Sequence, residues 1–123
     1  MTASNLCFRA AMLLLLAGML WGIQMAIAQD HSAFPAHAHL NLLGFVALFL
    51  SGLYYRAVPA AAGSVLGVIH AWTAILGAVA FPIGIAAVQQ GGAKFELLTA
   101  AGALIVFVGM AIFGIVVFRY SKD

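Results

Sequence analysis

Four apolar stretches constrain this chain more than any other feature of the sequence. They cover Phe8–Ala28, Ala36–Tyr55, Ser64–Val88 and Phe95–Phe118, and short polar or turn-rich links separate them. About 20 residues of helix are enough to cross the hydrocarbon core of a bilayer. Because short links force consecutive helices to run antiparallel, the sequence predicts an all-α transmembrane four-helix bundle with up-down topology.

The composition supports a lipid environment. Of the 123 residues, 66% are hydrophobic and only 7% are charged, whereas a soluble domain carries roughly 25% charged residues. Such a chain cannot cover itself with a polar surface, so its solvent has to be lipid. The length leaves room for one domain, residues 1–123, and for no separate soluble module.

The basic residues predict the orientation in the membrane. Arg9 lies at the start of the first apolar stretch, Arg56 follows the second, and Arg119 and Lys122 follow the fourth, while only Lys94 falls on the other side. The positive-inside rule then places both termini in the cytoplasm, as expected for a multi-pass protein of a bacterial inner membrane. This flanking pattern accounts for the net charge of +2, so nucleic acid is not expected as a partner.

The first stretch has a second interpretation as a secretory signal peptide. Arg9, an apolar run and the small residues of Ala26–Ala28 match the order of a signal sequence with its cleavage site. The apolar run is longer than a usual signal core. We therefore expect the first stretch to be retained as a membrane span.

The histidines are the candidate functional residues. His31, His37 and His39 lie at or near the predicted outer end of the second stretch, and His70 lies inside the third. An ionisable residue within a span indicates a functional site by default. Neutral imidazole is a good ligand for haem iron and for transition metals. Because His37 and His39 are two residues apart, they point about 200° away from each other on a regular helix.

His70 allows two interpretations. It lies about 10 Å past the predicted cytoplasmic start of the third stretch, at 1.5 Å per residue. It is either a ligand or a packed histidine that bonds to a neighbour, for which Thr73 and Ser51 are the candidates. The residue pattern leaves both open.

Copper or zinc binding is an alternative to haem. His31, His37 and His39 would form such a site with Met25, which is expected at a similar depth, because a thioether beside imidazoles suits copper(I). In a third alternative the protein is a purely structural membrane subunit, and its histidines only cap the second helix.

Glycines recur at helical spacing inside the spans. Small residues let helices approach closely in lipid, and such faces serve either packing within the chain or contacts between subunits. The pairs are Gly18 and Gly22, Gly44 and Gly52, Gly77 and Gly84, and Gly102 and Gly109.

The second stretch resembles a known family. The segment His39–Leu43 reads H-L-N-L-L and resembles the H-x-N-L-L stretch on the second helix of haem-copper oxidase catalytic subunits, in particular nitric oxide reductases and C-type oxidases. In those proteins the histidine is an axial ligand of low-spin haem b. Tyr54, Tyr55 and Pro59 also resemble that segment. The H-x-N match points to His39, whereas the distance to the tyrosine pair fits His37 better.

The chain is also similar to small four-span bacterial proteins, some of them labelled cytochrome oxidase subunit I-like. The resemblance implies a membrane-embedded haem b-binding protein in electron transfer, redox or gas sensing, or an accessory role to a respiratory complex. His37 or His39 would be one axial ligand, His70 or a symmetry-related histidine the other, and Asn41 would support the ligand. Four spans and four histidines are too few for a complete oxidase centre. We therefore expect no independent enzymatic activity, and a homo-oligomer or a subunit of a larger membrane complex.

Overall fold

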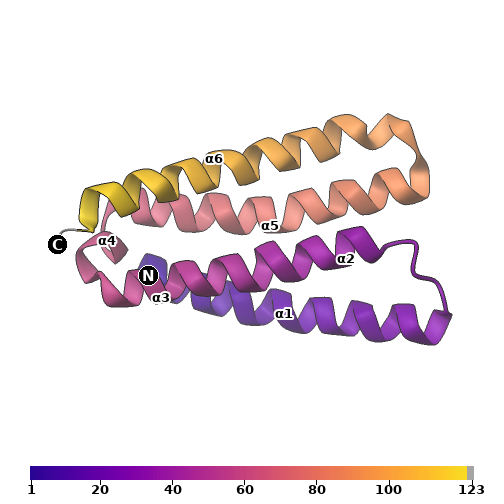
Figure 1. Cartoon of the computed structure of the whole chain (residues 1–123), viewed down its shortest axis with the longest axis horizontal. Coiled ribbons are helices and arrows are strands. Elements are labelled where there is room, and N and C mark those ends of the chain that lie inside the picture. The colour runs from indigo at the N-terminus through magenta and orange to yellow at the C-terminus, as the bar shows by residue number, and fades with distance from the viewer. Residues whose placement is uncertain (122–123) are drawn as a thin grey trace.

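The computed structural model describes residues 1–121, and every regular element in that range is helical (Figure 1). Helices α2, η1 and α3 follow one another without a break, so the chain forms four long helices. The elements are α1 (Ala3–Ala28), α2 (Phe34–Asn41), η1 (Leu42–Ala47), α3 (Leu48–Ala57), α4 (Pro59–Ala62), α5 (Val65–Gly91), η2 (Ala93–Phe95) and α6 (Glu96–Tyr120).

Four helical segments are long and apolar enough to cross a membrane. They are Ala3–Ala28, Phe34–Ala57, Val65–Gly91 and Ala93–Tyr120. The prediction of an all-helical, multi-pass membrane protein is therefore confirmed. Each segment extends past at least one end of the apolar stretch that predicted it, because helical hydrogen bonding continues where the hydrophobic pattern stops.

Side-chain caps define where two of the long helices begin. The Thr2 hydroxyl accepts a hydrogen bond from the backbone N–H of Asn5, and the Ser64 hydroxyl accepts one from the backbone N–H of Gly67 at 2.9 Å. These caps satisfy backbone donors that have no partner inside a helix. The first span consequently begins at Ala3, five residues earlier than the apolar pattern indicates.

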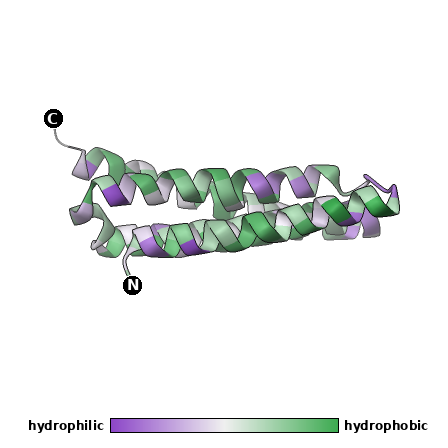
Figure 2. Ribbon diagram, turned by 90° about the horizontal axis from the view of Figure 1, so that it is seen from below, coloured by the Kyte–Doolittle hydropathy of each residue, from purple (hydrophilic) through white to green (hydrophobic). Residues whose placement is uncertain are grey.

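Small side chains form much of the interior, and large apolar side chains cover the outside. Ala3, Ala11, Ala36, Ala61 and Ala71 are fully buried, whereas leucines, isoleucines and phenylalanines of all four spans are exposed. Figure 2 shows hydrophobic residues along the length of the helices and hydrophilic residues mostly towards their two ends. This distribution suits a surface that lipid covers.

The glycine faces pack within the chain. A Cβ atom at Gly84 would lie 2.7 Å from Cα of Thr99, and one at Gly77 would lie 2.9 Å from a methyl group of Val106, so these glycines bring α5 and α6 together. Gly18 and Gly22 lie in the same way against α2. These glycine faces therefore make contacts between helices of one chain.

The second span contains a π-helical segment that the sequence pattern did not reveal. Residues Leu42–Ala47 form the π-helix η1 between α2 and α3. Within it, Gly44 approaches the side chain of Leu14 on α1. Single π turns inside α-helices are rare and occur frequently at functional sites.

Candidate functional site

His39 is held by a hydrogen bond to its own helix. Its Nδ1 atom lies 2.7 Å from the carbonyl oxygen of Pro35 in the first turn of α2. A carbonyl only accepts, so Nδ1 carries the proton and donates it. The other ring nitrogen, Nε2, is therefore left with a lone pair. Pro35 suits this first turn because its missing N–H would have no partner inside the helix.

The lone pair of His39 is accessible from outside the bundle. The ring packs edge-to-face against Phe81 of α5, with 5.1 Å between the ring centroids. The side chain is partly exposed, and Nε2 is not among the polar atoms of the described residues that are buried without a hydrogen-bond partner. His39 thus presents a nitrogen that can bind a metal, at the boundary between α2 and α5.

His37 points away from His39, as the two-residue spacing predicts. The Asn41 amide nitrogen lies 3.2 Å from His37 Nε2 and 3.2 Å from the His37 carbonyl oxygen. The amide donates, so Nε2 is the acceptor and Nδ1 carries the proton. Nδ1 of His37 and the amide oxygen of Asn41 are buried without a partner. Gly22 of α1 lies against the His37 ring, and the Trp21 ring packs edge-to-face on the same imidazole.

His70 forms a second polar pair, in the half of the bundle that holds the chain termini. It is fully buried in α5, and its Nδ1 atom lies 2.9 Å from the Tyr55 hydroxyl of α3. Phe113 of α6 stacks on the ring. The neighbours suggested by sequence, Thr73 and Ser51, instead donate to the carbonyls of Ile69 and Ala47 in their own helices. The sequence pattern singled out Tyr55 only as part of the oxidase-like segment and did not indicate it as a partner of His70.

The structure does not bring His39 and His70 together. His39 lies beside Phe81, which follows His70 in the same helix, α5, by about 16 Å at 1.5 Å per residue. Two axial ligands of one iron have to lie on opposite sides of a single atom. A pairing of His39 with His70 inside one chain therefore does not fit this fold.

The expected copper or zinc cluster is also not assembled. Among residues 1–121 no group of three or more histidine, cysteine, aspartate or glutamate side chains lies close enough to hold a metal ion. His31 is exposed in the α1–α2 loop, His37 faces α1, and His39 faces α5. Met25 is buried in α1 and does not line the open groove beside His37. Helical geometry separates residues that the sequence places close together.

The α1–α2 loop has a local structure that holds His31 outside the bundle. Gln29 adopts a left-handed conformation at the end of α1, with φ 51°. The Asp30 carboxylate then accepts a hydrogen bond from the backbone N–H of Ser32 at 3.0 Å. This backbone hydrogen bond, with a second from the Ser32 hydroxyl, lowers the pKa of Asp30 below its ordinary value.

The interior of the bundle contains a small cavity. A cavity of about 20 Å³ lies between the second span, α5 and α6. One water needs about 10–15 Å³ on the same scale. A porphyrin is far larger, so the interior of a single chain does not fit haem.

Comparisons with protein-family models, with curated protein sequences and with solved structures gave no match. The function is therefore argued from the residues themselves. Two features bear on it: the unbonded Nε2 of His39 and the cavity beside His70.

Proposed function

We propose that this chain is a haem b-binding protein of a bacterial inner membrane, with four up-down spans and both termini in the cytoplasm. It would act in electron transfer, in redox or gas sensing, or as an accessory to a respiratory complex. The observation that carries the proposal is the hydrogen bond from His39 Nδ1 to the Pro35 carbonyl. Metal-ligating histidines characteristically donate their other ring N–H in this way, which fixes the tautomer and raises ligand basicity.

His39 fits the role of axial ligand better than the other two histidines of the spans. In His37 the Nε2 lone pair already accepts from Asn41, and the other ring nitrogen is enclosed. In His70 one nitrogen bonds Tyr55, and the other faces a cavity that no porphyrin can enter. The oxidase-like H-x-N motif also points to His39.

The haem would lie against the outside of the bundle, because the interior has no room for it. His39 would hold one side of the iron, and Phe81 would support the imidazole ring. The second axial ligand would come from another polypeptide. His39 of a second copy across a two-fold axis is the simplest source. Bound there, haem supplies one-electron chemistry, whose potential the protein sets through ligand hydrogen bonding and burial.

The test is the haem content of purified protein. We expect the wild-type chain, expressed with ample haem and kept in mild detergent, to show Soret absorbance. His39→Ala should lose it. His31→Ala, which removes an exposed loop histidine, is the matched control and should retain it.

Two results would overturn the proposal. One is wild-type protein with no Soret absorbance, including protein that carries copper or zinc in place of haem by elemental analysis. The other is equal haem content in wild type, His37→Ala and His39→Ala. Loss of haem in His37→Ala alone would reassign the ligand to His37, within the same function.

A further inference from the structure

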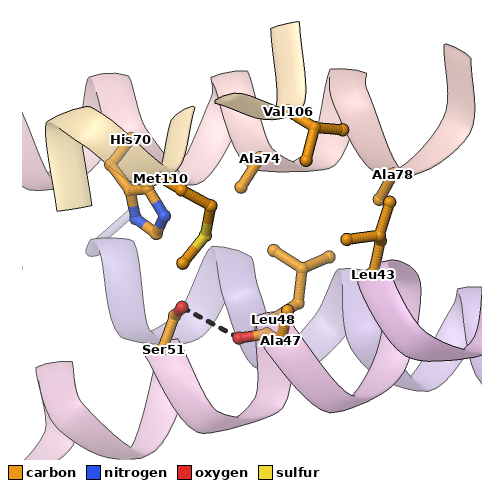
Figure 3. Close-up of a pocket in the computed structure, with 9 residues that line it drawn as sticks. All are labelled: Leu43, Ala47, Leu48, Ser51, His70, Ala74, Ala78, Val106 and Met110. Atoms are coloured by element: carbon orange, nitrogen blue, oxygen red, sulfur yellow. Dashed lines mark hydrogen bonds between the residues drawn. The ribbon is translucent and has the colours of Figure 1, made fainter. Parts of the chain in front are cut away.

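The cavity beside His70 has two polar groups in its wall. Figure 3 shows the His70 ring and the Ser51 side chain projecting from opposite helices towards the same space, next to Met110. His70 is 0% exposed and Ser51 is 4% exposed. The His70 Nε2 atom has no hydrogen-bond partner among the described residues. The remaining wall is apolar: Leu43, Ala47, Leu48, Ala74, Ala78 and Val106.

Hydrogen-bond counting assigns the proton of His70. Tyr55 has a single hydroxyl proton, and His70 is its only partner among the described residues. If Nδ1 donated to Tyr55, both the phenol proton and the Nε2 lone pair would be buried without partners. If Tyr55 donates to Nδ1, only the N–H at Nε2 lacks a partner. The second arrangement is favoured because each buried unsatisfied group is costly.

Ser51 presents the complementary group. Its hydroxyl donates its one proton to the Ala47 carbonyl at 2.8 Å, so towards the cavity it can only accept. The cavity thus has a donor on one wall, Nε2–H of His70, and an acceptor on the other, Oγ of Ser51. No direct hydrogen bond joins these two side chains. A molecule that accepts from His70 and donates to Ser51 would satisfy both.

We propose that this cavity is a binding site for one water molecule, which bridges His70 and Ser51. Water both donates and accepts, and a cavity of about 20 Å³ exceeds the 10–15 Å³ that it needs. An apolar gas offers no comparable acceptor to Nε2–H. A metal cation does not fit, because the proton at Nε2 occupies the lone pair that would bind it.

The bound water completes a buried polar chain that runs from Tyr55 of α3 to His70 of α5 and back to Ser51 of α3. This chain joins α3 to α5 at a level where the surrounding side chains are apolar. In this chain His70 has a structural role and binds a water molecule, so His70 is no longer a candidate haem ligand. The inference does not depend on haem, because it rests on the interior of one chain.

Histidine ¹⁵N NMR of the whole protein in detergent tests the site. We expect the His70 ring to be protonated at Nε2 and to accept a hydrogen bond at Nδ1. The Nε2 proton should show a cross-relaxation peak with a slowly exchanging water. A wild-type ring protonated at Nδ1, or the absence of that water peak, would overturn the proposal.

A matched pair of variants isolates the bridging role. Ser51→Val removes the hydroxyl and places two methyl groups on Cβ, which take away the acceptor and occupy cavity space, and the water peak should disappear. Thr73→Val removes a hydroxyl that also bonds to a carbonyl four residues back, on the helix of His70 but outside the cavity wall. It should leave the peak unchanged. A peak that persists in Ser51→Val, or equal loss in both variants, would contradict the bridge.

Xenon provides an independent measurement on the wild-type protein. Dry apolar cavities bind xenon, whereas a cavity already filled by a hydrogen-bonded water does not take it up readily. We expect no xenon-induced shift of the methyl signals of Ala74 and Ala78. A saturable shift there would show a dry cavity and would refute the water site.

Discussion

The closeness of α5 and α6 makes a graded prediction for glycine-to-alanine substitutions. A Cβ atom at Gly84 would lie 2.7 Å from Cα and 2.9 Å from the backbone nitrogen of Thr99. At Gly109 its nearest neighbour would be 3.4 Å away, and at Gly114 nothing lies within 4 Å. All three glycines lie within long helices, so they differ chiefly in the space around them.

The expected magnitudes follow from two opposing terms. Alanine is more favourable than glycine inside a helix by roughly 0.5–1 kcal/mol. Overpacking a close contact costs about 1–3 kcal/mol, and Thr99 meets Gly84 with rigid backbone. We therefore expect Gly114→Ala to stabilise the protein by up to about 1 kcal/mol, because only the helix term applies. Gly84→Ala should destabilise the protein by about 1–2 kcal/mol net. The stability of Gly109→Ala should lie between those of the other two variants.

The assay is equilibrium unfolding of the three variants in mild detergent, followed by helical circular dichroism during titration with a denaturing detergent. The order Gly114→Ala, Gly109→Ala, Gly84→Ala in decreasing stability would support the packing described here. Equal stabilisation of Gly84→Ala and Gly114→Ala would show that α5 and α6 are not in this close contact. It would refute the reasoning from the glycine face.

Three further predictions concern other parts of the chain. Tyr55→Phe leaves His70 Nδ1 buried without a partner and should lower the free energy of unfolding by about 1–3 kcal/mol. Tyr54→Phe is the control: the Tyr54 hydroxyl bonds to Ser121 at an exposed position, so its loss should change the free energy of unfolding by less than about 0.5 kcal/mol. Gly22→Leu should displace His37 and lower the melting temperature of the single chain. A change in the mass of the native assembly with no change in melting temperature would contradict the packing within the chain. A reporter fused to the C-terminus should be active in the cytoplasm, and periplasmic activity would reverse the proposed topology.

The number of spans was predictable because it depends on local properties. Length and hydropathy along 20 residues decide whether a segment can cross a bilayer, and no knowledge of neighbours is needed. The divergence of His37 and His39 was predictable for the same reason, since helical periodicity alone sets the angle between them. The start of α1 was misplaced because the Thr2 cap extends the helix beyond the apolar pattern.

Partners across the bundle were decided only by tertiary structure. The sequence indicated Thr73 and Ser51 as hydrogen-bond partners of His70, but helix packing places Tyr55 there. The partner depends on the rotation and depth of two helices at once. The same packing sets His39 beside Phe81, which lies about 16 Å further along α5 than His70. Sequence had left the glycine faces open between two uses, because a small residue permits close approach without specifying what approaches. The chain itself determined that histidines would lie within apolar helices, and hydrogen bonds within α2 set the ring nitrogens of His37 and His39. Only packing between α3 and α5 decided which nitrogen of His70 is bonded.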